Sequence, residues 1–155
     1  MPEQRGEEMA RKIQTRLPLT PMAGARARRC LEPLRAQIDP RSFESLRLLV
    51  TELVNNSLNH SGRPEGDPIT LTVELGNHDV HAEVVDRGTG GLVRRPLKPD
   101  AESGWGLYLV DRLADDWGYS RQGHTRVWFV LSTRSNGKIR PFPSSWPEGS
   151  QAGSA

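Results

Sequence analysis

The sequence predicts an α/β fold in which helices cover one face of a mixed, mostly antiparallel sheet, giving a two-layer α/β sandwich. Apolar residues alternate in two adjacent segments, 69–76 and 80–86, which indicates two strands joined by a hairpin turn at Gly76–Asp79. Residues 39–62 carry the apolar spacing of a long helix. Because hairpin strands are adjacent in the chain while helices gather elsewhere, this order favours two layers over a doubly wound sheet.

The N-terminal part of the domain predicts one strand and one helix. Residues 12–19 alternate loosely between apolar and polar, and we expect a strand at the edge of the sheet because Pro18 cannot donate to a ladder. Residues 21–38 predict a helix. Pro33 either kinks this helix or opens its second half.

The long helix has recognisable ends. Asp39 can cap it, Pro40 lies in its first turn and Gly62 follows its last turn. Its spacing predicts a buried apolar stripe made of Leu46, Leu49, Val50, Leu53, Val54 and Leu58.

The C-terminal part is predicted to contain a loop, a helix and a strand. Residues 87–104 hold glycines, prolines and charges without periodicity, which indicates a long loop. Residues 106–118 then read as a helix and 126–132 as a strand, with Trp128 expected in the core.

Length and composition indicate one domain with a single core. We expect the domain at 12–133, a flexible lead at 1–11, and a disordered tail at 134–155 that is rich in Ser, Gly and Pro. The net charge of +2 is too small to argue for nucleic acid. Cys30 is the single cysteine, which favours the reducing cytoplasm, and no apolar run approaches the length of a membrane span.

Glu52, Asn56 and His60 recur at every fourth position of the long helix. Because four residues turn a helix by about 40° beyond a full turn, their side chains form one line along it. A solvated polar stripe is the ordinary interpretation, since Glu and Asn are common on helix surfaces. If a polar site lies opposite, the Asn oxygen suits Mg²⁺, and Glu can accept a proton from a hydroxyl or water that attacks a phosphate.

Glycines mark two further clusters. Asp86, Gly88 and Gly90 end the second hairpin strand: this pattern is often a turn, but the carboxylate can also accept a hydrogen bond from the exocyclic amine of adenine. Gly104 and Gly106 precede a helix, either as a flexible start or as bare amides that hold phosphates at the positive end of the helix dipole. The spacing fits neither a P-loop nor a Rossmann fingerprint.

The order of these clusters is more specific than any one of them. A helix with E-x-x-x-N, a strand ending in D-x-G-x-G, and a loop ending in G-x-G at a helix start resemble the sequence boxes of the GHKL ATPase superfamily. The matching stretches are 52–60, 86–90 and 104–118. The subgroup that they resemble most is the bacterial anti-sigma factor serine/threonine kinases, which are small histidine-kinase-like ATPase domains. The resemblance implies a sandwich of the GHKL (Bergerat) type that binds ATP and Mg²⁺.

The resemblance also assigns roles to residues of this sequence. Glu52 would be the general base, Asn56 the Mg²⁺ ligand, and Asp86 the partner of the adenine amine. Residues 91–103 would form a short lid over the nucleotide. His60 matches a residue common in the subgroup, to which no catalytic step is assigned. The ATP-binding residues implied in this way are Asn56, Asp86, Gly88, Gly90, Gly104, Gly106, Leu107 and Thr125.

The function expected from the resemblance is a Mg-ATP-dependent protein serine/threonine kinase. It implies a STAS-domain anti-sigma factor antagonist as substrate, a sigma factor as a sequestered partner, and a homodimer. A nucleotide-gated regulatory module with little or no kinase activity is the alternative, against which the pairing of Glu52 with Asn56 counts. A sensor histidine kinase is disfavoured because no helical hairpin with a phospho-acceptor His precedes the domain. Nucleic-acid binding would rest on Arg26, Arg28 and Arg29, which read first as a solvated face.

Overall fold

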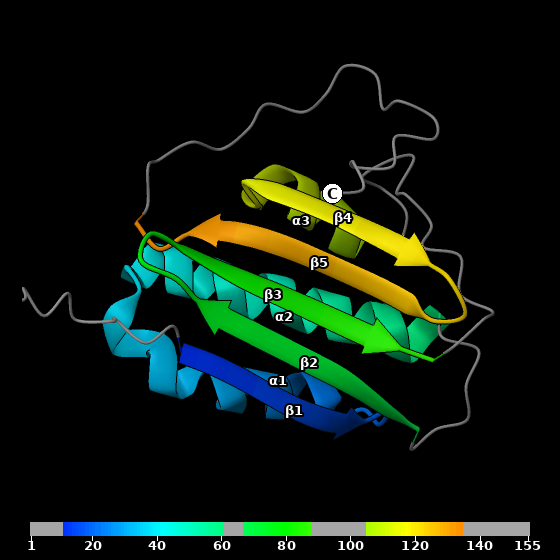
Figure 1. Ribbon diagram of the computed structural model, residues 1–155. Coiled ribbons are helices and arrows are strands. Elements are labelled where there is room, and N and C mark those ends of the chain that lie inside the picture. The colour runs from blue at the N-terminus through cyan, green and yellow to red at the C-terminus, as the bar shows by residue number, and fades with distance from the viewer. Residues whose placement is uncertain (1–10, 61–66, 88–104, 135–155) are drawn as a thin grey trace, which may run out of the picture.

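A computed structural model of the chain describes residues 11–60, 67–87 and 105–134. Its helices form one layer and its strands the other (Figure 1). In chain order, the elements are β1 (Arg11–Pro18), α1 (Ala23–Leu31), the 3₁₀ helix η1 (Glu32–Gln37), α2 (Pro40–His60), β2 (Pro68–Leu75), β3 (Asp79–Asp86), α3 (Trp105–Leu113), β4 (Asp116–Arg121) and β5 (Thr125–Ser132).

The five strands form one sheet in the order β1-β2-β3-β5-β4. All four pairings between these strands are antiparallel, so the described part of the sheet lacks the parallel pairing that a mixed sheet would contain. Helices α1, α2 and α3 lie on one face, and the other face carries no helix of the described residues (Figure 1). The expected two-layer sandwich is confirmed, with β1 at the predicted edge.

The buried residues of the strands and the apolar stripe of α2 pack together in one core. Val80, Ala82 and Val84 of β3 point toward the helices, as do the matching residues of β2 and β5. Leu46, Leu49, Val50, Leu53 and Val54 of α2 are fully buried against them. Because burying each large apolar side chain stabilises the fold by about 1.5–3 kcal/mol, this contact fixes α2 over the sheet.

The start of α2 follows from its capping residue. The Asp39 carboxylate accepts hydrogen bonds from the backbone N–H groups of Arg41 at 3.0 Å and Ser42 at 3.3 Å. Pro40 occupies the first helical position, where its missing N–H removes no bond. The expected cap is confirmed, while Gly62, expected beyond the helix end, lies outside the described residues.

The helix expected at 21–38 is divided in two. α1 ends at Leu31, and Pro33 lies in the first turn of η1. A proline is tolerated there because the first N–H groups of a helix have no partner within it. Of the two alternatives, Pro33 therefore opens a second helical segment and does not kink a continuous one.

The prediction of a helix at 106–118 is wrong for its last five residues, 114–118. α3 ends at Leu113, and β4 follows and pairs with β5. Asp115 lies between α3 and β4 and binds to β5. Its N–H donates to the Val130 carbonyl at 2.9 Å, and its carboxylate accepts from the Ser132 N–H at 2.6 Å. Ladder bonds to β5 satisfy the backbone groups that a longer helix would have satisfied internally.

The pairing of β4 with β5 also shows that the expectation of Trp128 in the core is wrong. Trp117 and Tyr119 pack against the core, so Gly118 between them faces the open side of the sheet. Trp128 lies opposite Gly118 and is half-buried on that open side, where it stacks on His81 with ring centroids 5.8 Å apart. It is therefore not part of the core between sheet and helices.

The described helices include none that combines the length and apolar character needed to cross a membrane. β1 begins at Arg11, one residue before the expected start of the domain. Apart from Arg11, Arg87 and Arg134, the expected lead (1–11), loop (87–104) and tail (134–155) lie outside the described residues.

Candidate functional site

The candidate site lies at the end of the sandwich where β3 ends and β5 begins. The C-terminal half of α2 runs behind this end of the sheet (Figure 1). Glu52 and Asn56 are one turn apart on α2 and both are half-buried. Leu53 and Val54, which lie between them in sequence, are buried in the core and hold the backbone that carries the two polar groups.

Asp86 and Thr125 form the strand side of the site. They are paired neighbours on β3 and β5, and both face the helix layer, with exposed fractions of 4% and 8%. Ser57 of α2 is also buried. Polar groups cost free energy when they are removed from water without hydrogen bonds. The Asp86 carboxylate and the hydroxyl groups of Thr125 and Ser57 thus place polar atoms in an otherwise apolar interface of sheet and helix.

The Glu52 carboxyl group lies in a partly dehydrated environment. Its burial raises its pKa above the ordinary value of 4.5, because water stabilises the charged form less there. A carboxylate with a raised pKa is a stronger base. The position of Glu52 therefore suits it to accept a proton from a hydroxyl group or water molecule.

The first turn of α3 supplies backbone donors. Gly106 and Leu107 belong to this turn, whose N–H groups have no acceptor within the helix. α3 ends beside the start of β4, so its first turn points toward the opposite end of the sheet, where β5 begins (Figure 1). The amides of this turn and the positive end of the helix dipole make it suited to phosphate groups.

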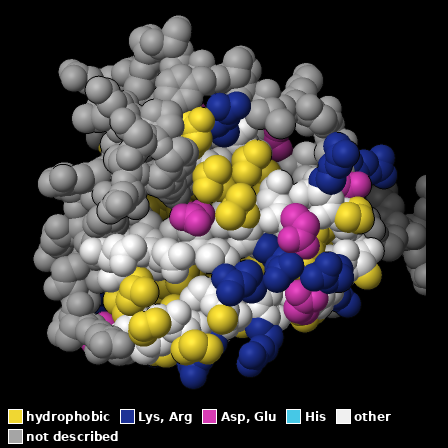
Figure 2. All heavy atoms as spheres, turned by 180° about the vertical axis from the view of Figure 1, so that it is seen from behind, with side chains coloured by type: hydrophobic (Ala, Val, Ile, Leu, Met, Phe, Trp, Pro, Cys, Tyr) yellow, Lys and Arg dark blue, Asp and Glu magenta, His cyan; other side chains and the backbone are white. Residues whose placement is uncertain are grey.

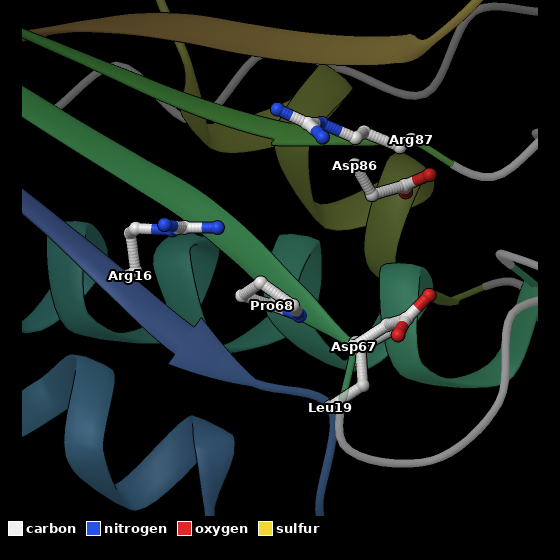
Figure 3. Close-up of a pocket in the computed structure, with 6 residues that line it drawn as sticks. All are labelled: Arg16, Leu19, Asp67, Pro68, Asp86 and Arg87. Carbon is white, nitrogen blue, oxygen red and sulfur yellow. The ribbon is translucent and has the colours of Figure 1, made fainter.

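A pocket of about 200 Å³ adjoins Asp86 at the ends of β1, β2 and β3. Figure 3 shows Arg16 and Arg87 extending over the strands, while Asp67 and Asp86 lie at the strand ends. Its lining is completed by Leu19 and Pro68. The pocket therefore places two cations and a second carboxylate next to the residue expected to bind adenine.

Several predicted site residues lie on elements that reach one end of the fold. Glu52, Asn56, Asp86 and Thr125 are described there, with Gly106 and Leu107 at the start of α3. Gly88, Gly90, Gly104 and the expected lid at 91–103 lie outside the described residues. His60 lies in the last turn of α2, but its side chain is not described.

Sequence reasoning missed Arg16, Asp67 and Arg87 as residues near the site. Arg87 directly follows Asp86, and this adjacency could have suggested it. Arg16 and Asp67 come close only because β1 pairs with β2, with Arg16 opposite Thr70. The described residues contain no cluster of three His, Cys, Asp or Glu side chains that could hold a metal. The Mg²⁺ ligand expected from the sequence, Asn56, is not one of these residue types.

Comparisons with known proteins agree with this arrangement. The sequence matches the family model of the histidine kinase-like ATPase domain over residues 17–131, most of the chain. A search of curated proteins found no match. The fold is similar to the crystal structure of the RsbU and RsbW domains of Rv1364c from Mycobacterium tuberculosis, with a TM-score of 0.61 and 20% sequence identity. That match covers 78% of this chain and 32% of the other, so this chain spans about a third of its length. The predicted resemblance to histidine kinase-like ATPase domains is confirmed, and the chain belongs to that family.

Proposed function

We propose that the protein is a Mg-ATP-dependent serine/threonine kinase of the anti-sigma factor type, which phosphorylates a STAS-domain antagonist. The observation that carries this proposal is the position of Glu52 and Asn56 on one line of α2, at the end of the sheet where Asp86 and Thr125 are buried. One helix thus presents a base and a neutral oxygen ligand beside a buried polar surface.

ATP fits the buried polar groups by their chemistry. The Asp86 carboxylate can accept a hydrogen bond from the adenine amine, and the Thr125 hydroxyl on the neighbouring strand faces the same side of the sheet. The amides of the first turn of α3 would hold the phosphates. Gly88, Gly90 and Gly104 are proposed to complete the binding site.

Mg²⁺ fits Asn56 because it prefers oxygen ligands and keeps several water molecules. The amide oxygen of Asn56 would hold the ion, and the bound ion would neutralise charge on the ATP phosphates. The remaining ligands would be phosphate oxygens and water, so a single protein ligand suffices.

Glu52 carries the proton transfer in this proposal. A serine or threonine oxygen of the partner forms a bond to the γ-phosphorus while the bond to the bridging oxygen of ADP breaks. Glu52 takes the hydroxyl proton, and its raised pKa favours that acceptance. The amides of the α3 first turn stabilise the charge that develops on the phosphates.

The second candidate function is a nucleotide-gated regulatory module that binds a partner, such as a sigma factor, with little or no catalysis. A binding module needs the nucleotide contacts of Asn56 and Asp86 but has no need of a base at Glu52. We therefore favour the kinase. In this proposal residues 12–133 form the domain that carries the activity, and the protein acts in the cytoplasm. A homodimer is compatible with both functions.

Phosphate transfer tests the proposal directly. The protein is incubated with Mg²⁺, γ-labelled ATP and purified STAS-domain proteins of the same organism, beside Glu52→Ala and the control Glu74→Ala, which changes an exposed glutamate of β2. Label on one STAS-domain protein, lost only in Glu52→Ala, would support the kinase. If wild type binds Mg-ATP but labels none of them, the regulatory module is favoured.

Binding measurements test the site assignment separately. Asn56→Ala is expected to weaken Mg-ATP binding markedly because it removes the oxygen ligand of the ion. Asn77→Ala serves as the matched control, since Asn77 is exposed in the β2–β3 turn, away from the start of β5. Titration calorimetry with and without Mg²⁺ measures both variants. Equal affinities for wild type and Asn56→Ala under both conditions would contradict the assignment.

A further inference from the structure

The face of the sheet that points away from the helices carries an aromatic and apolar patch around Trp128. No helix of the described residues covers this face (Figure 1). The Trp128 indole stacks on His81, with ring centroids 5.8 Å apart. Val85 of β3 and Val130 of β5 lie on the same face, and β3 and β5 are inner strands of the sheet. We name these four partly buried residues, His81, Val85, Trp128 and Val130, the open-face patch.

The charged groups within the open-face patch are paired with each other. Glu83 lies opposite Trp128, and its carboxylate accepts a hydrogen bond from Arg126 Nε at 2.6 Å. On the other side of Trp128, the indole occupies the space that a side chain at Gly118 would fill. The patch therefore offers aromatic surface together with an indole N–H that can donate to a carbonyl group.

The chain leaves β5 on the side of the open-face patch. Ser132 shares the face of Trp128 and Val130 at the end of β5. Its hydroxyl donates to the Arg134 carbonyl at 2.9 Å and accepts from the Arg134 N–H at 3.3 Å. Because a side chain of the open face binds the backbone of Arg134, the chain that continues from Arg134 starts on that side of the sheet.

Charges favour the same face for the segment that follows. Asp79 and Asp116 are exposed on the two strands that flank the end of β5. Residues 134–140 carry three positive charges and no negative charge. The helix layer, in contrast, carries a group of basic side chains around a few acidic ones (Figure 2). Because opposite charges attract, this basic stretch is favoured beside the two aspartates over the helix layer.

The residues after the basic stretch suit the open-face patch. Phe142 and Trp146 lie among three prolines in the stretch PFPSSWP, residues 141–147. Proline-rich segments favour the polyproline II form, whose carbonyls make no internal hydrogen bonds, and they bind to aromatic side chains. From Arg134 to Phe142 such a segment reaches about 25 Å, whereas Trp128 lies only about 13 Å back along β5 from Ser132. The segment is therefore long enough to reach the patch.

We propose that residues 135–147 fold back over the open face of their own sheet. Phe142 and Trp146 cover the open-face patch, and the basic stretch lies beside Asp79 and Asp116. The inference does not depend on the proposed kinase function, because this face is the side of the sheet opposite to α2 and its Glu52.

A spin label on the full-length chain tests the inference. The label is attached to Ser145→Cys in a Cys30→Ala background, so that one cysteine carries it. Amide signals of residues 81–85 and 126–130 in nitrogen-15 NMR spectra should then lose most of their intensity, while those of α1 and α2 keep theirs.

Two variants of the spin-labelled chain test the contacts themselves. Phe142→Ser combined with Trp146→Ser should restore the signals of the open face. Lys138→Glu combined with Arg140→Glu should restore them as well, because it reverses the attraction to the two aspartates. Arg26→Glu combined with Arg29→Glu is the matched control: it changes the net charge equally on α1 and should leave the losses in place.

Three outcomes would overturn the inference. Signal losses of similar size on both faces of the domain would refute the docking of residues 135–147. Losses confined to α1 and α2 would place this segment on the helix layer. In a mixture of spin-labelled chains without nitrogen-15 and nitrogen-15 chains without the spin label, losses on the open face would assign the contact to a second copy of the chain.

Discussion

Gly118→Ala tests whether Gly118 belongs to β4, as in the structure, or to the end of the helix that the sequence predicted at 106–118. A Cβ at this position would lie 2.8 Å from Cζ2, 2.9 Å from Cε2 and 3.0 Å from Nε1 of Trp128. The indole is a rigid ring, and it is stacked on His81 on the open face of the sheet. It cannot withdraw by rotation of a flexible end, so the strands must separate or the indole must leave its position.

The size of the effect follows from these distances. Real Cβ atoms essentially never approach a neighbour within 3.0 Å, and two of the three contacts are shorter than that. Inserting a methyl group into a packed contact costs about 1–3 kcal/mol. For a domain of this size each kcal/mol lowers Tm by about 2–4 °C, so we expect Gly118→Ala to lower Tm by about 2–12 °C.

A double-mutant cycle measured by urea unfolding isolates the contact with the indole. Trp128→Ala removes the ring, so Gly118→Ala should cost much less in that background. Gly123→Ala is the control: its φ of +72° makes alanine unfavourable, but no atom lies within 4 Å of its Cβ position, so its cost should not depend on Trp128. A glycine that ended a helix would likewise show no coupling to Trp128. Equal costs of Gly118→Ala in both backgrounds would refute the pairing of β4 with β5.

Two further predictions concern the site. Burial raises the pKa of Glu52, so Glu52→Gln, which removes the charge, should stabilise the protein at neutral pH. Urea unfolding at several pH values measures this gain in stability. The gain should vanish as the pH falls through the folded-state pKa toward 4.5, because the wild-type carboxyl group is then protonated in the folded protein. The same variant should lose about 10²- to 10⁴-fold in phosphate transfer, whereas unchanged transfer would exclude Glu52 as the base. Asp86→Asn should weaken ATP binding by at least about tenfold in calorimetry, because a charged hydrogen-bond acceptor becomes neutral; unchanged affinity would place adenine elsewhere.

The elements that the sequence predicted well are those determined by neighbouring residues. The hairpin of β2 and β3 follows from alternation on both sides of a short turn, and the Gly76 N–H donates to the Asp79 carbonyl at 2.9 Å within it. The start of α2 follows from Asp39, which bonds to amides two and three residues later. No distant contact is needed to recognise either feature.

β4 forms a hairpin with β5, but the part of β4 that overlaps the expected helix, residues 116–118, pairs with residues 10 to 14 positions away. Neighbouring residues alone therefore did not reveal it. Asp116 pairs with Val130, and Asp115 bonds to the backbone of Val130 and Ser132. Locally, the segment continues a helix pattern as far as Ala114, which is buried against the core. The pairing with β5 overrides that local preference. It also determines the side of the sheet on which Trp128 lies.

The candidate site likewise combines residues that could be placed from their neighbours in sequence with residues that only the folded sheet brings close. Glu52 and Asn56 could be placed together from helix geometry, and Asp86 from its place at the end of a strand. That Asp86 lies opposite Thr125 depends on the register of β3 with β5, which neither strand specifies by itself. Arg16 reaches the pocket beside Asp86 through the pairing of β1 with β2, so its neighbours could be identified only from the folded sheet.

The position of the site on α2 links its chemistry to the core. Glu52 and Asn56 are half-buried because they lie at the border between the buried stripe of the helix and solvent, and this is also why the pKa of Glu52 is raised. Leu53 and Val54 fix the helix against the sheet, and so they hold the distance from Glu52 and Asn56 to the buried groups on β3 and β5. A helix held this firmly can position a base for phosphate transfer, because small displacements of a catalytic group are costly. The packing that gives the helix its stability is therefore the same packing that orients the proposed site.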